Sequence, residues 1–193
     1  MNNNKQVKGK KGIKRIVLII LGVFFLAIVV GIGFLSSAVS SINKEHEPNE
    51  IVLGNGEKTA LLIYEPSSSD TAQEVTLWIA QIMANHGYTV TINLPSKELS
   101  YDWEEYDLIA LGSPIYTGNV SPVLKEYVER NPVENKKILL YAMGLLPAED
   151  NKEINEMNSW ISESNNISKM KCKVDEREPF ESFVEKTLTD WDE

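Results

Sequence analysis

Cysteine and histidine, which build many catalytic and metal sites, are scarce in this chain of 193 residues. The one cysteine, Cys172, excludes a disulfide within the chain. The two histidines, His46 and His86, are far apart in sequence, and no group of residues has the spacing of metal ligands. The sequence therefore predicts neither a bound metal nor a Ser-His-Asp set, and it offers no catalytic residue.

Acidic residues are absent from the first 44 positions, although the chain contains 28 of them. Six of the 19 basic residues, by contrast, lie within residues 1–15. The remainder of the chain is strongly acidic and would repel the phosphates of a nucleic acid, so we expect no nucleic-acid partner. An acidic surface suits a basic protein partner, or simply solubility.

Charged and polar side chains are both absent from residues 16–35, a run of 20 residues. A helix of that length spans ~30 Å, the hydrocarbon thickness of a membrane. A cleavable signal peptide is the main alternative, with small residues at 37–40 (SAVS), but its apolar core usually has only ~7–15 residues. We favour an uncleaved transmembrane anchor in the cell membrane. Residues 1–15 form a basic segment that should stay in the cytoplasm, which would place the C-terminal domain outside it.

Residues 36–57 predict a linker, because Ser, Asn, Glu, Pro and Gly are frequent and no apolar period runs through the segment. His46 is expected to be a solvated residue of this linker. One folded domain is expected over residues 58–193.

Strand-like and helix-like patterns alternate through this domain, which predicts an α/β fold with a parallel sheet. Strands are expected at 59–64, 88–93, 107–112, 137–143 and 170–174, and helices at 71–86, from 121, at 152–162 and from 180. The first, third and fourth strands are apolar throughout and should be central. The second and fifth alternate and should lie at the edges, with Cys172 on the buried face and Lys171 and Lys173 on the other.

A five-stranded order of 2-1-3-4-5 satisfies this pattern, with helices on both faces. Ligands of such sheets bind beyond the carboxyl ends of the strands, where the strand order reverses. The loops that meet there are 65–71, 113–119 and 144–150. The first is rich in serine and precedes a helix, so its hydroxyls, its amides and the positive end of the helix could hold a phosphate. A loop that only caps the helix is the alternative.

These loops carry a resemblance to the flavodoxin family. Residues 106–119, YDLIALGSPIYTGN, resemble the Gly-Ser-Pro-Ile-Tyr-x-Gly loop of short flavodoxin-like proteins, including the protoporphyrinogen-oxidase-like branch. Residues 144–147, GLLP, resemble the third loop of that branch, and residues 67–71, SSSDT, are similar to the phosphate loop Thr/Ser-x-Thr-Gly-Asn-Thr. The likeness covers about residues 58–165.

The resemblance implies a flavodoxin-like, doubly wound fold with an FMN site. The phosphate would lie on the first loop, the flavin ring would be flanked by the second with Tyr116 stacking on it, and the third would close one edge. The residues implied to bind the cofactor are Ser67, Ser68, Ser69, Asp70, Thr71, Ser113, Pro114, Ile115, Tyr116, Thr117, Gly118, Asn119, Gly144 and Leu145.

Two departures from the family pattern keep alternatives open. Ser69 replaces the family's glycine, so a backbone that needs positive φ would be strained there. Asp70 replaces its asparagine and would repel a phosphate unless it turned away to cap the helix. The leading hypothesis is a membrane-anchored FMN electron-transfer protein with a redox partner protein or quinone. The alternatives are a flavodoxin fold that has lost FMN and serves as an extracytoplasmic interaction module, and a flavin-dependent oxidase or quinone reductase at the membrane.

Overall fold

The computed structural model describes residues 46–145 and 150–193. The predicted transmembrane anchor at 16–35 lies outside the described residues. Within the described ranges, no helix combines the length and the apolar character needed to cross a bilayer.

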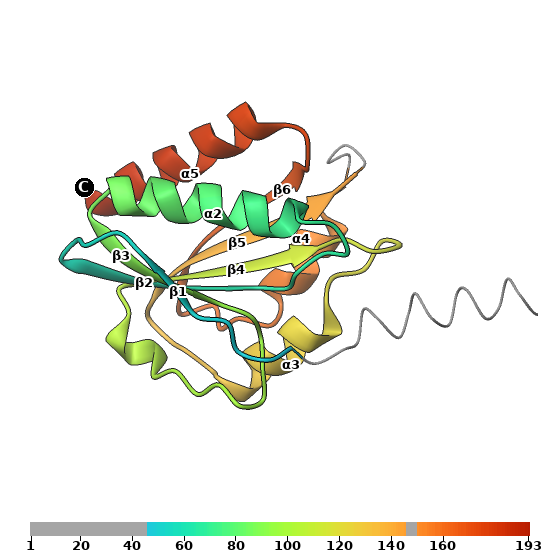
Figure 1. The fold of residues 1–193 in the computed structure, drawn as a ribbon, viewed down its shortest axis with the longest axis horizontal. Coiled ribbons are helices and arrows are strands. Elements are labelled where there is room, and N and C mark those ends of the chain that lie inside the picture. The colour runs from blue at the N-terminus through green and yellow to red at the C-terminus, as the bar shows by residue number, and fades with distance from the viewer. Residues whose placement is uncertain (1–45, 146–149) are drawn as a thin grey trace, which may run out of the picture. The chain divides into compact units, whose positions relative to one another are not determined.

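A six-stranded sheet forms the centre of the domain, in the order β1-β3-β2-β4-β5-β6 (Figure 1). Strands β2 to β6 are parallel, and β1 runs antiparallel to β3. The five parallel strands therefore have the predicted 2-1-3-4-5 order, and the α/β class is confirmed. The strands are β1 (Ile51–Leu53), β2 (Lys58–Tyr64), β3 (Tyr88–Asn93), β4 (Leu108–Pro114), β5 (Lys137–Gly144) and β6 (Asn166–Lys173).

Helices cover both faces of the sheet (Figure 1). Helices α2 (Thr71–Asn85) and α5 (Arg177–Asp192) pack on one face, and α3 (Pro122–Arg130), α4 (Lys152–Asn158) and the short 3-10 turn η1 (Trp103–Glu105) lie on the other. Strand β2 contributes side chains to the hydrophobic cores on both faces of the sheet because they alternate: Leu62 packs toward α2, and Leu61 toward α3. Its fully apolar sequence follows from this double burial.

The linker predicted over residues 36–57 is wrong in its second half, because this range contains strand β1. Ile51–Leu53 pair with residues 90–92 of β3, so the folded domain begins before residue 58 and β3 is not an edge strand. Three residues are too few to show a period; β1 is held by its backbone pairing with β3 and by Ile51, which packs against the core. The alternation in β3 has another cause: Val90 and Ile92 are buried in the core, whereas Thr89 and Thr91 on the other face are only half-buried.

The boundaries of α4 and β6 also differ from those expected. The helix predicted over 152–162 ends at Asn158, where the Ser159 hydroxyl donates to the Glu156 carbonyl (2.7 Å) and closes the last turn. Strand β6 begins at Asn166, earlier than predicted, because its polar first half is ordered by backbone pairing with β5. Its place at the end of the sheet is as expected.

A close contact between β4 and β5 lies beneath α2. A Cβ atom added to Gly112 would come within 2.1 Å of the Tyr141 ring, so this position has no room for a side chain. The Tyr141 hydroxyl is hydrogen-bonded to Thr76 Oγ1 of α2 (2.9 Å), which fixes the ring under the helix. The start of α2 is thereby held over the carboxyl ends of β4 and β5.

Candidate functional site

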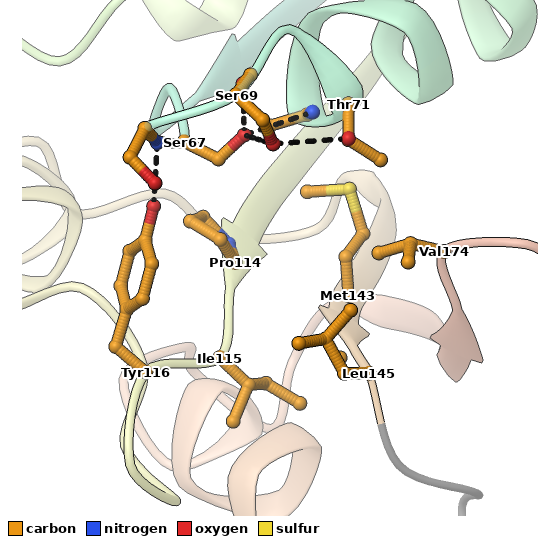
Figure 2. Close-up of a pocket in the computed structure, with 12 residues that line it drawn as sticks. Ser67, Ser69, Thr71, Pro114, Ile115, Tyr116, Met143, Leu145 and Val174 are labelled. Atoms are coloured by element: carbon orange, nitrogen blue, oxygen red, sulfur yellow. Dashed lines mark hydrogen bonds between the residues drawn. The ribbon is translucent and has the colours of Figure 1, made fainter.

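A cavity of about 160 Å³ opens at the carboxyl ends of β4 and β5, next to the loop that precedes α2 (Figure 2). The loop forms a polar wall, and the ends of the strands form an apolar one. Its lining residues are Ser67, Ser68, Ser69, Thr71, Ala72, Pro114, Ile115, Tyr116, Met143, Gly144, Leu145 and Val174. Three lining residues were not predicted from the sequence: Ala72, Met143 and Val174, although Met143 directly precedes the predicted Gly144.

Three hydroxyl groups gather on the polar wall of this cavity (Figure 2). Ser67 Oγ accepts the Ala72 N–H (3.2 Å) and donates to the Ser69 carbonyl. Ser69 Oγ and Thr71 Oγ1 are 3.0 Å apart. Ser67 therefore caps the first turn of α2 and orients the loop, while Ser69 and Thr71 bring two hydroxyls to the positive end of a helix of 15 residues.

The structure shows neither the backbone strain expected at Ser69 nor the helix cap considered for Asp70. Among the described residues other than glycine, only Thr117 and Asn135 have positive φ, so Ser69 carries no such strain. Asp70 is exposed and does not line the cavity. It occupies the N-cap position of α2 but makes no side-chain cap bond, because its backbone is already helical (φ −70°, ψ −1°) instead of extended. The carboxylate thus neither lines the cavity nor caps the helix.

The loop after β4 contains a tight turn that faces the serine loop. Tyr116 and Asn119 exchange two backbone hydrogen bonds (2.9 and 3.0 Å), and the residues between them, Thr117 and Gly118, both have positive φ. At the start of this turn the Tyr116 hydroxyl accepts the Ser68 N–H (3.0 Å; Figure 2). Tyr116 therefore lines the cavity and also ties its two loops together. The stacking role implied for its ring stays a prediction.

Ser113 and Asn119, like Asp70, are absent from the lining of this cavity, as are Thr117 and Gly118 of the turn. Ser113 is fully buried; its hydroxyl donates to the Pro114 carbonyl (3.0 Å) and accepts the Ser121 N–H (2.9 Å). It thereby positions the start of α3, because alternation along β4 directs Ser113 toward that helix. Asn119 is exposed, and its side-chain amide donates to the Thr117 carbonyl within the turn (3.2 Å).

A serine loop before the first helix, a turn after the third parallel strand and a cavity where the strand order reverses are features of one fold family. Residues 61–176, more than half of the chain, match the family model described as a flavodoxin domain. The chain belongs to the flavodoxin domain family.

Solved flavodoxins share this fold. The oxidised Flavodoxin 2 from Bacillus cereus is 14% identical, with a TM-score of 0.56 over 69% of this chain and 99% of that one. A flavodoxin from the domain Archaea is 15% identical, with a TM-score of 0.51 over 68% and 94%. A flavo di-iron protein from Thermotoga maritima is 15% identical, with a TM-score of 0.50 over 70% of this chain and 36% of that one. No curated protein matches the chain in sequence. The fold is one used for flavin binding and electron transfer.

A buried carboxylate stands at the base of the serine loop of this flavodoxin domain. Glu65 follows β2 directly, is 2% exposed, and its Oε1 lies 2.9 Å from Nε2 of His46. Burial raises the pKa of Glu65 above its ordinary value, and the hydrogen bond to His46 opposes that rise. His46 is thus not the solvated linker residue that was expected. The segment it belongs to is held against the domain, since the Asn49 N–H donates to the side chain of Asn93 at the end of β3 (2.8 Å).

A second cavity, of about 250 Å³, adjoins the first and shares Ile115, Gly144 and Leu145 with it. The Thr117–Gly118 turn and an ion pair between Glu153 of α4 and Lys171 of β6 complete its lining. Alternation along β6 suggested an open face for Lys171, but α4 covers that face, and the lysine side chain is only 7% exposed. Its hydrogen bond to Glu153 raises the pKa of Lys171, which stays charged. The sequence held no signal for this pair, because the two residues are 18 positions apart.

Proposed function

We propose that this flavodoxin domain binds FMN and passes electrons to a partner. The observation that carries the proposal is the convergence of a hydroxyl-bearing helix start and an apolar wall on one cavity at the reversal of strand order. A phosphate needs the first and a planar aromatic ring needs the second. The chain's own residues meet both needs within one site, and the departure at Asp70 places no carboxylate in the cavity lining.

Each wall has a distinct task in this proposal. Ser69, Thr71 and the N-terminal end of α2 would hold the phosphate, because the Ser68 N–H is already engaged by Tyr116. Ile115 and Tyr116 would flank one side of the ring, and Leu145 the other. When bound, FMN supplies the one- and two-electron chemistry; the protein binds it, orients it and excludes water from its ring.

We also propose that residues 16–35 anchor the domain in the cell membrane with the domain outside the cytoplasm. The charge asymmetry supports this orientation, since the basic residues precede the apolar run and the acidic ones follow it. Protease treatment of intact, wall-stripped cells is the test. Digestion of the C-terminal domain is expected, and full protection of that domain would overturn the orientation.

The test of FMN binding is a titration of the detergent-solubilised full chain with FMN, followed by visible absorption and flavin fluorescence. A shifted absorption band and quenching that saturate at micromolar protein are expected. The absence of saturable change, from protein shown to be folded by circular dichroism, would overturn the proposal. That result would favour an interaction module without FMN, in which the Tyr116–Ser68 bond closes the phosphate loop.

A further inference from the structure

The Glu153–Lys171 pair is buried at the side of a cavity that the phosphate site does not need. Lys171 Nζ lies 2.9 Å from Glu153 Oε2, and the two side chains are 7% and 9% exposed. Removing two charges from water is unfavourable, and a well-packed apolar pair would serve stability as well. A purely structural role therefore leaves the position of the pair beside open space unexplained.

The pair leaves unused hydrogen-bonding capacity directed at the cavity. Glu153 Oε1 accepts no hydrogen bond from residues 46–145 or 150–193, and it faces Gly118, where an added Cβ would lie 3.9 Å from it. The Lys171 ammonium has three N–H donors: one is given to Glu153 at 2.9 Å, and the other two make longer contacts with the carbonyl (3.3 Å) and Oδ1 (3.5 Å) of Asp150, whose side chain is 72% exposed. A free acceptor on Glu153 thus stands beside an ammonium whose long contacts with the exposed Asp150 a ligand carbonyl could replace.

A donor next to an acceptor is complementary to a ring edge on which a carbonyl adjoins an N–H group, as in an imide. The flavin ring ends in such an edge, with one N–H between two carbonyls. The two cavities share Ile115, Gly144 and Leu145, so a ligand whose phosphate lies on the serine loop could extend past these residues toward the pair. A quinone has carbonyls but no N–H, and it would leave Glu153 without a donor.

We propose that Glu153 and Lys171 bind the imide edge of the flavin, with Glu153 Oε1 accepting the ring N–H and the Lys171 ammonium donating to the neighbouring carbonyl. This inference rests on the proposed FMN function. It makes the second cavity the determinant of ring identity, whereas the serine loop recognises only the phosphate. Glu153 and Lys171 are then binding residues contributed by α4 and β6, outside the three loops that the sequence pointed to.

The first test changes the ligand and leaves the protein intact. The full chain is titrated with FMN and with 3-methyl-FMN, which keeps the phosphate and the ring but replaces the N–H by a methyl group. At least tenfold weaker binding of 3-methyl-FMN is expected. Equal affinities for the two flavins would overturn the inference and leave the proposed function standing. Failure of both flavins to bind would overturn the proposed function, and the inference with it.

The second test uses matched variants on the same two elements. Glu153→Ala should reduce the discrimination against the methyl group to less than twofold, while Glu156→Ala, one turn along α4 and outside the cavity, should keep it. Lys171→Met should raise the infrared carbonyl stretching frequency of bound FMN, while Lys169→Met, which removes the lysine that donates to Asn155, should not. Equal behaviour of target and control variants, each shown to be folded, would overturn the inference.

Discussion

The hydroxyl of Tyr116 accepts the backbone N–H of Ser68 at 3.0 Å, although the two residues are 48 positions apart. This bond joins the turn after β4 to the loop that precedes α2. It also occupies a backbone donor that a phosphate on the serine loop would otherwise use. In the proposed phosphate site, ligand binding is therefore expected to depend on the hydroxyl of Tyr116.

Two substitutions at Tyr116 separate its ring from its hydroxyl. Tyr116→Phe frees the Ser68 N–H and keeps the ring, so FMN should bind more tightly than to the wild type. Tyr116→Ala removes the ring and should weaken binding by ~1–3 kcal/mol. Fluorescence titration measures both affinities. An unchanged affinity in the alanine variant would show that the ring does not contact the flavin.

Gly112→Ala should destabilise the domain, because the added Cβ would lie 2.1 Å from the Tyr141 ring. Forcing a methyl group into a packed core costs about 1–3 kcal/mol in the free energy of unfolding. Urea denaturation measures the loss. Combining Gly112→Ala with Tyr141→Leu should cost less than the sum of the two single changes, because the clash is then gone. Strict additivity would mean that the ring is not the obstacle.

The buried carboxylate of Glu65 should make stability depend on pH. Burial raises its folded-state pKa, so the folded protein binds its proton more tightly than the unfolded chain does. The resulting stabilisation is fully present below the ordinary value of 4.5 and is lost as the pH rises through the raised pKa. Glutamine does not titrate, so Glu65→Gln should not lose stability in this way. The unfolding free energy of the variant minus that of the wild type should therefore increase above about pH 4.5 and then level off.

The hydrogen bond from the neighbouring His46 acts on the pKa of Glu65 in the opposite direction to burial. The comparison is therefore repeated with His46→Gln in both proteins, which isolates the carboxylate. Unfolding curves at half-unit steps of pH give the profile. Parallel profiles with and without Glu65 in the His46→Gln background would contradict the expected linkage.

Cys172 should be unreactive in the folded protein. Burial raises the pKa of its thiol to about 12, and the residue is 4% exposed on the core side of β6. The thiolate is the reactive form, so Ellman's reagent at pH 8 should react slowly with native protein and at once in denaturant. Rapid, stoichiometric reaction under native conditions would show that this part of β6 opens readily.

The central strands and the switch point were predictable because their signals are local. Fully apolar runs such as 107–112 indicate strands covered on both faces, and the stripe from Val75 to Met83 indicates a helix over a core. Strand order then places the carboxyl ends of β2, β4 and β5 together. The two adjoining cavities lie there and are lined by eleven of the fourteen residues expected to bind the cofactor.

Tertiary structure alone decided the features that depend on pairing between distant segments. Strand β1 is ordered by the backbone of β3, His46 by Glu65, and Lys171 by the covering helix α4. None of these partners is a sequence neighbour, so no periodicity or spacing in the sequence indicates them. A related reason applies to Ser113 and Asp70: strand alternation directs Ser113 toward α3, and the helical backbone of Asp70 goes with a side chain that makes no cap bond, so residue type alone did not decide either role. The pattern of apolar and polar residues indicates whether one face or both faces of a segment are buried. Which distant segment it contacts is decided only by the folded structure.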